Sequence, residues 1–125
     1  MSYLFDTTVL IDWAVAHPGV RGVVEQCYEE TSELYTCDVV VCEALSAGSE
    51  AEREVIRRFV SGLEYLCIDP DGAEHAGELR RIAGRRSRRT LGDALIAALA
   101  IRSGATIVTR NMTDFATFDL SVLTY

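Results

Sequence analysis

The feature that most constrains this sequence is a repeated alternation of short apolar runs with longer segments of helical periodicity. The first instance is the apolar run Tyr3–Phe5, which is followed at once by Asp6 and then by a helical pattern over 7–16. Short apolar runs bounded by polar residues are typical of buried strands, and apolar positions spaced three and four apart are typical of helices. Strands that alternate with helices predict an α/β fold with a mainly parallel sheet.

The alternation continues along the chain, and no repeat, linker or low-complexity segment interrupts it. A chain of 125 residues is the size of one domain, so we expect a single domain over 1–125. Its expected architecture is a three-layer α/β/α domain around a sheet of four to five strands. The expected strands are 3–5, 34–37, 65–68, 105–108 and an edge strand at 120–123, and the expected helices are 7–16, 20–30, 39–48, 49–63, 73–84 and 94–101.

Charge and hydropathy restrict the functions that this chain can have. The net charge is −7, and all 12 basic residues are arginine because the sequence contains no lysine. A chain with this charge does not hold a polyanion through its overall field, so such a contact requires a local basic patch or a bound cation. The longest apolar run, 94–101, is too short to cross a bilayer, and no basic segment precedes the first apolar run. These features predict a cytoplasmic protein.

The four cysteines do not have the spacing of a metal site or a redox motif. None forms a CxxC pair, and no histidine lies at zinc-motif spacing. We interpret all four as small buried hydrophobic residues that stay reduced in a cytosol. They are Cys27, Cys37, Cys42 and Cys67.

Two acidic residues occupy positions where an acid is unexpected. Asp6 follows the first strand directly, and open parallel sheets bind their ligands at the carboxyl ends of strands. The alternative for Asp6 is an N-cap of the next helix. Glu43 lies in a helix that is otherwise almost entirely apolar or small, where burying an unpaired carboxylate costs several kcal/mol. The alternative for Glu43 is a narrow solvent-facing stripe shared with Ser46.

Two further acids adjoin the last expected helix and strand. Asp93 introduces the apolar helix 94–101, and its alternative role is a capping-box pair with Thr90. Asp114 follows the strand 105–108 in a loop of small polar residues, and its alternative role is a local turn or helix cap.

The chain topology expected for an α/β fold brings these four acids to one side of the sheet. Carboxylates that converge without a counter-charge repel one another, and no lysine is present to neutralise them. Oxygen ligands select hard cations, so Mg²⁺ or Mn²⁺ is the expected partner. Such a site is suited to metal-assisted hydrolysis of phosphodiesters.

A basic segment lies immediately before the third acid. It contains Arg85, Arg86, Arg88 and Arg89, a few residues before Asp93. Guanidinium groups bind phosphate through paired hydrogen bonds, so we interpret the segment as a contact for a substrate backbone. A solvated loop and a docking site for an acidic partner remain as alternatives.

Four motifs in order resemble those of PIN-domain ribonucleases, and most of all VapC toxins of type II toxin–antitoxin systems. The resemblance covers essentially the whole chain. A common form of the second motif is Glu-Leu-x-x-Gly, whereas here Ala44 stands between Glu43 and Leu45. The matching segments are 5–12 (FDTTVLID), 42–48 (CEALSAG), 93–100 (DALIAALA) and 108–115 (VTRNMTDF).

The resemblance implies a role for each matching residue. Asp6, Glu43, Asp93 and Asp114 would form an acidic quartet, with Asp6 and Asp93 as the most direct Mg²⁺ ligands. Supporting polar positions would be Thr7, Thr109 and Asn111. The residues expected to contact RNA are Arg85, Arg86, Arg88, Arg89 and Arg110.

The activity implied by the resemblance is Mg²⁺-dependent cleavage of tRNA, rRNA or mRNA, with Mn²⁺ as a substitute. It also implies a homodimer and a cognate VapB-type antitoxin that occupies the active-site groove and adds an arginine to the quartet.

Two other classes of function remain to be weighed. The segment 5–9 superficially resembles the nucleophile loop of haloacid-dehalogenase-type phosphatases, but Thr8 replaces the second aspartate of that loop and the usual catalytic lysine is absent. A receiver domain is disfavoured for the same missing lysine. The non-enzymatic alternative is an inactive PIN-like binding module that acts in an antitoxin and DNA-repressor complex.

Overall fold

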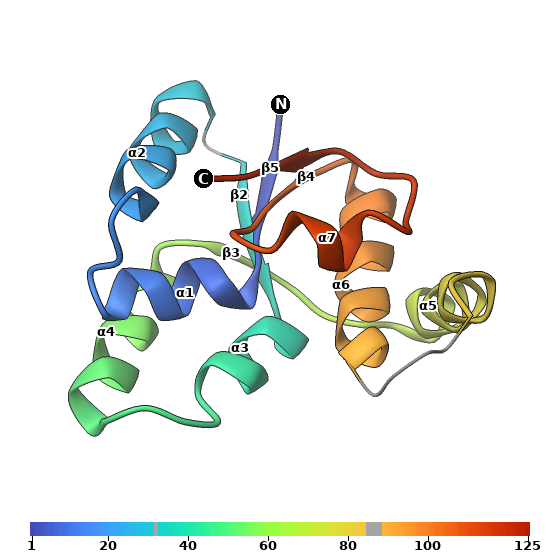
Figure 1. Cartoon of the computed structure of the whole chain (residues 1–125), viewed down its shortest axis with the longest axis horizontal. Coiled ribbons are helices and arrows are strands. Elements are labelled where there is room, and N and C mark those ends of the chain that lie inside the picture. Colours follow the sequence, from blue (N-terminus) through green and yellow to red (C-terminus); the bar gives the residue numbers. More distant parts are fainter. Residues whose placement is uncertain (32, 85–88) are drawn as a thin grey trace.

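The computed structural model of the chain describes residues 1–31, 33–84 and 89–125. A parallel five-stranded sheet forms its centre (Figure 1). The strands are β1 (Tyr3–Phe5), β2 (Leu34–Cys37), β3 (Glu64–Leu66), β4 (Thr106–Val108) and β5 (Val122–Leu123). Their order in the sheet is β3-β2-β1-β4-β5, and every neighbouring pair is parallel. The predicted α/β class and the mainly parallel sheet are therefore confirmed.

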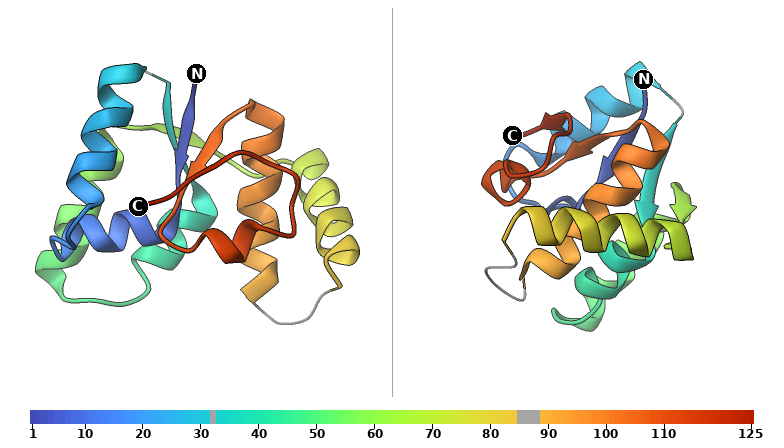
Figure 2. Two further views of the ribbon diagram at one scale, coloured as in Figure 1. Left: turned by 45° about the horizontal axis from the view of Figure 1, so that its top comes forward. Right: turned by 90° about the vertical axis from the view of Figure 1, so that its right-hand side faces the viewer.

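Helices cover the sheet on both sides. Figures 1 and 2 show α1, α2 and α4 on one side and α5 and α6 on the other, while α3 lies beneath the carboxyl ends of the strands. The short α7 lies beside α6 and β5. The helices are α1 (Thr7–Ala14), α2 (Val20–Glu30), α3 (Asp38–Ala44), α4 (Glu50–Ser61), α5 (Pro70–Ile82), α6 (Arg89–Ser103) and α7 (Met112–Phe115).

The strand that comes first in the sequence is the central strand of the sheet. Tyr3 is in register with Leu34 of β2 on one side and with Thr106 of β4 on the other. The pairing with β4 extends past the strand, because Asp6 N–H donates to the Val108 carbonyl at 3.0 Å. The first residue after β1 is thereby fixed beside the end of β4.

Capping residues explain where two of the helices begin. The Ser49 hydroxyl accepts a hydrogen bond from Glu52 N–H at 3.1 Å, which satisfies a free donor at the start of α4 as its sequence predicts. Asp69 does the same for Gly72 N–H, and Pro70 occupies the first turn of α5. The predicted start of this helix near residue 73 was therefore too late.

The helix that carries Glu43 is shorter than predicted. It begins at Asp38 and ends at Ala44, four residues before the expected stop at Gly48. Cys37 occupies the N-cap position, and Asp38 is the first residue of the helix, one residue before the expected start at residue 39. The Asp38 carboxylate instead accepts from Val39 N–H and Ile68 N–H, which ties the start of α3 to the chain leaving β3.

The apolar core surrounds β1 and the inner faces of the helices. Phe59 of α4 packs on Phe5 and on Trp13, with ring centroids 5.6 and 5.1 Å apart. The expectation that all four cysteines are buried was wrong for Cys42 and Cys67, which are exposed; Cys27 and Cys37 are buried. No helix in the described part of the chain has the length and apolar character needed to cross a membrane.

Candidate active site

An open pocket of about 350 Å³ lies where β1 ends. All four predicted acids line it, although they come from the end of β1, from α3, from α6 and from α7. Two of the three predicted supporting residues line it as well, and the third, Thr109, is buried behind it. The lining residues are Asp6, Thr7, Thr8, Glu43, Asp93, Asn111 and Asp114.

Asp6 is the most buried of the four acids, with 5% of its surface exposed. It occupies the N-cap position of α1, but its side chain makes no capping hydrogen bond. The carboxylate instead accepts hydrogen bonds from the hydroxyls of Thr109 at 2.8 Å and Thr8 at 3.3 Å, both at Oδ2. Asp6 therefore stands at the cap position of α1, while its side-chain hydrogen bonds come from two threonine hydroxyls.

The two threonine hydroxyls are held in a donating orientation toward Asp6. Thr8 Oγ1 accepts from Arg110 N–H, and Thr109 Oγ1 accepts from Asn111 N–H, both at 3.0 Å. A hydroxyl that accepts a backbone donor keeps its own hydrogen available for another acceptor. The backbone leaving β4 thus places both hydroxyls within donating distance of the same carboxylate oxygen, and the two hydroxyls lie 3.3 Å from each other. The role of Thr8 was missed in the sequence, where only its position two residues after Asp6 hinted at it.

Burial dominates the electrostatics of Asp6. Removal of the carboxylate from water raises its pKa, and the charge of Glu43 adds to that rise. The hydrogen bond from Thr109 and the backbone N–H groups of Thr7 and Thr8 oppose it. Such an arrangement favours a positive charge next to Asp6. Among the described residues that line the pocket, none is basic.

Glu43 lies on the exposed side of α3, so the predicted solvent-facing stripe is real. Its carboxylate nevertheless lines the pocket, where Oε1 accepts a hydrogen bond from Thr7 Oγ1 at 2.8 Å. Thr7 is the first residue of α1, directly after Asp6. One short segment therefore supports two acids, Asp6 through Thr8 and Glu43 through Thr7.

Asp93 and Asp114 complete the acidic lining. The helix α6 begins at Arg89, which makes Asp93 its fifth residue rather than the residue that introduces it. Asp114 lies in α7 and is exposed, and its N–H donates to the Asn111 carbonyl at 3.1 Å. Both carboxylates reach the pocket from helices that follow the first two acids by 50 residues or more.

The donors around the pocket are carboxylate, hydroxyl and amide oxygens, which is the ligand chemistry of a hard divalent cation. Within the described residues, no three His, Cys, Asp or Glu side chains are close enough to hold a metal ion as they stand. The acids therefore share one pocket without forming a closed coordination cluster.

The structure describes only two of the five arginines that were predicted to contact RNA, Arg89 and Arg110. Arg85, Arg86 and Arg88 lie outside the described residues, and Arg89 begins α6. Arg110 forms an ion pair whose partner is Asp12. Its Nε lies 2.7 Å from Asp12 Oδ2 and its Nη2 lies 3.3 Å from Oδ1.

Asp12 belongs to the first of the four motifs, but the sequence did not predict its contacts. It is 2% exposed, and it also accepts a hydrogen bond from the Tyr125 hydroxyl at 2.6 Å. Burial and this bond raise the pKa of Tyr125. The network links the end of α1 to two segments about 100 residues later. In the sequence, the only sign of this role is that Asp12 stands between the apolar residues Ile11 and Trp13.

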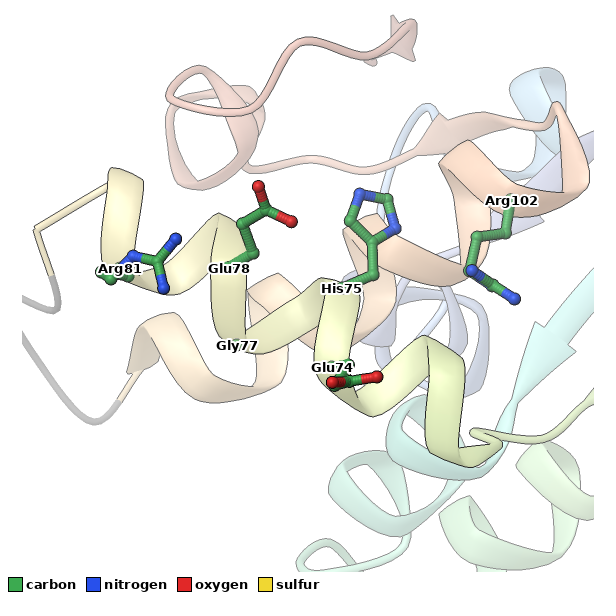
Figure 3. Close-up of a pocket in the computed structure, with 6 residues that line it drawn as sticks. All are labelled: Glu74, His75, Gly77, Glu78, Arg81 and Arg102. Carbon is green, nitrogen blue, oxygen red and sulfur yellow. The ribbon is translucent and has the colours of Figure 1, made fainter.

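A second open hollow lies along α5 and has a different character. Figure 3 shows its lining side chains on the exposed side of α5, with Arg102 contributed by α6. Acidic and basic groups balance there, so the hollow lacks the uncompensated negative charge of the acidic pocket. The acidic pocket at the end of β1 is therefore the better candidate for a catalytic site. The lining residues of the hollow are Glu74, His75, Gly77, Glu78, Arg81 and Arg102.

The fold and the pocket together define an α/β protein with an acidic site at the carboxyl edge of a parallel sheet. The chain matches the PIN domain over residues 3–119. This chain belongs to the PIN-domain family, as its four motifs predicted.

Similar proteins include toxins and toxin–antitoxin complexes. Ribonuclease VapC11 of Mycobacterium tuberculosis is 34% identical over 116 residues, which cover 86% of this chain and 85% of that protein. A toxin–antitoxin complex from Klebsiella pneumoniae superposes with a TM-score of 0.80 at 27% identity, over 98% of this chain and 97% of that one. VapBC2 from Rickettsia felis, bound to a DNA fragment from its promoter, shares the fold with a TM-score of 0.78 at 22% identity, over 100% and 99% of the two chains.

Proposed function

We propose that this chain is a divalent-metal-dependent endoribonuclease, the toxin of a VapBC-type toxin–antitoxin pair, which acts in the cytoplasm. The observation that carries the proposal is the convergence of four acids from four separate segments on one pocket. Relatives named VapC ribonucleases and solved toxin–antitoxin complexes of the same fold support it.

In the proposed site, Asp6 and Asp93 hold Mg²⁺, with Mn²⁺ as a substitute, and Glu43 and Asp114 complete the ligand set. The bound cation would supply Lewis acidity for the attack of water on an RNA phosphodiester. The fixed hydroxyls of Thr8 and Thr109 hold the carboxylate of Asp6 in place. The surrounding protein thereby prepares an anionic site before the cation arrives.

The proposed RNA contact is the arginine-rich segment that comes before Asp93 in the sequence. It contains Arg85, Arg86, Arg88 and Arg89. We assign Arg110 first to its ion pair with Asp12, since that contact occupies two of its nitrogen atoms.

The cognate antitoxin is the proposed protein partner. An apolar groove of about 440 Å³ lies between α1, α2 and α4, and Trp13 of α1 forms part of it. Thr7 at the other end of the same helix lines the acidic pocket, roughly 10 Å away by helix rise. One antitoxin segment can therefore place apolar side chains in the groove and a basic side chain in the pocket. The groove residues are Trp13, Val24, Glu25, Tyr28, Glu29 and Phe59.

The decisive experiment is cleavage of RNA by purified protein with Mg²⁺, with Mn²⁺ and with EDTA. We expect wild type to cleave only with a divalent cation, and Asp6→Asn and Asp93→Asn to lose at least about 100-fold in rate. The matched control is Asp71→Asn, which removes an exposed aspartate of α5 outside the pocket and should leave the rate unchanged. Identical products from all four proteins would mean that the activity belongs to a contaminant.

The competing function is an inactive binding module that acts only within an antitoxin complex on DNA. It predicts antitoxin binding without metal-dependent turnover. Melting temperature separates the two by a second route, because Mg²⁺ should stabilise wild type by mass action and Asp93→Asn less. Equal stabilisation of both proteins would count against a shared metal site.

A further inference from the structure

The residue immediately before Asp93 in α6 is a glycine, Gly92. A Cβ at residue 92 would lie 2.9 Å from Glu43 Oε2 and 3.4 Å from Glu43 Cδ. A carbon atom does not approach a carboxylate oxygen that closely without displacing it. The carboxylate of Glu43 therefore occupies the space that any side chain at Gly92 would fill.

The backbone does not explain the glycine. Gly92 is not among the residues with positive φ, so any L-residue fits its backbone conformation. Glycine inside a helix is also unfavourable relative to alanine because it loses more conformational entropy on folding. The observation left to explain Gly92 is the close approach of Glu43.

Glu43 has a contact on its other carboxylate oxygen as well. Thr7 Oγ1 donates to Oε1 at 2.8 Å, while Oε2 is the atom nearest to the missing Cβ of Gly92. We propose that Gly92 is a positioning residue, which admits the Glu43 carboxylate to the face of α6 beside Asp93 so that both acids serve the same cation. This inference rests on the proposed metal-dependent function and adds a residue that the four motifs do not assign.

The exposed position of Glu43 determines how an alanine at residue 92 would act. The carboxylate is the far end of a flexible side chain, so it yields and the helix stays intact. Gly92→Ala should therefore fold, have a higher melting temperature and bind the cation more weakly. A damaged core would instead lower the melting temperature. A matched control is Gly77→Ala in α5, because a Cβ at Gly77 meets nothing within 4 Å (Figure 3).

The first part of the test is a stability cycle. Gly77→Ala should raise the melting temperature by about 2–6 °C. Gly92→Ala should give a similar gain in the Glu43→Ala background and a smaller one in wild type, where the displaced carboxylate loses its bond to Thr7. Equal gains in both backgrounds, or a Gly92→Ala protein that does not fold even with Glu43→Ala, would overturn the inference.

The second part measures Mn²⁺ binding by calorimetry and turnover of RNA. Gly92→Ala should weaken Mn²⁺ binding and lower kcat by about 10-fold or more with KM for RNA unchanged, whereas Gly77→Ala should change neither. In the Glu43→Ala background, Gly92→Ala should have no further effect, since the group it displaces is gone. Wild-type Mn²⁺ affinity in Gly92→Ala would refute the positioning role. An inactive wild type would refute the proposed function, while the stability cycle would still decide whether Gly92 accommodates Glu43.

Discussion

Removal of Arg110 tests whether its ion pair with Asp12 is a structural contact. The Asp12 side chain is 4% exposed and the Arg110 side chain is 41% exposed, with 2.7 Å between Nε and Oδ2. Breaking a fully buried pair by deleting one partner typically destabilises a protein by roughly 3–5 kcal/mol. Water reaches Arg110, and Tyr125 keeps its bond to Asp12, so we expect Arg110→Met to lose about 2–3 kcal/mol.

The assay is urea unfolding followed by circular dichroism, with Arg58→Met as the matched control. Arg58 pairs with Glu54 at 3.4 Å on the surface of α4, where both side chains are at least half exposed, and its loss should cost less than about 0.5 kcal/mol. Adding Asp12→Asn to Arg110→Met should recover part of the stability, because the unpaired buried charge is then removed.

The reasoning is refuted if Arg110→Met is no less stable than Arg58→Met, or if Asp12→Asn fails to recover any stability. A raised KM for RNA together with unchanged stability would instead assign Arg110 to the RNA surface. The two measurements therefore separate a structural arginine from a substrate contact.

Two further predictions concern titration and thiol exposure. Burial raises the pKa of Asp6, so ionisation of Asp6 opposes folding. Asp6→Asn should therefore raise the urea midpoint of the metal-free protein at neutral pH. This gain should disappear as the pH falls below 3.8, the ordinary pKa of the carboxyl group. An equal gain at pH 7 and at pH 3.5 would show that the charge is not the cause. With a disulfide reagent at pH 8, the exposed thiols of Cys42 and Cys67 should react quickly. Cys27 and Cys37 should react only after unfolding, since burial raises the pKa of each thiol to about 11. Four fast thiols would contradict this assignment.

Much of the fold follows from local patterns in the sequence. The bounds of β1, β2 and α2 agree with the prediction, because the two strands are short runs bounded by polar residues and the helix has a clear period that begins after Pro18 and Gly19. The four acids that line the pocket were also singled out from the sequence: Asp6 and Asp114 follow strands, and Glu43 and Asp93 adjoin apolar helical segments. The start of α5 was missed because Asp69 and Pro70 act both as the stop of a strand and as the start of a helix.

The supporting contacts of the site depend on tertiary pairing, which no local pattern encodes. Thr8 and Thr109 meet although they are far apart in sequence, and Asp12 meets Arg110 only after β4 joins the sheet. Gly92 carries no local signal of its purpose, because its reason is a side chain on another helix. The exposure of Cys42 was likewise decided by how α3 lies at the edge of the fold.

The central place of β1 has a consequence for a protein that is made by ribosomes and is proposed to cleave RNA. A ribosome completes β1 early, yet the hydroxyl of Thr109, which makes the shorter hydrogen bond to Asp6, lies 103 residues later, beyond β4. A nascent chain thus cannot assemble its acidic pocket until most of it has emerged, since folding waits for contacts between distant segments. Translation of the toxin would accordingly be nearly finished before the molecule could cut any RNA, including that of its own ribosome.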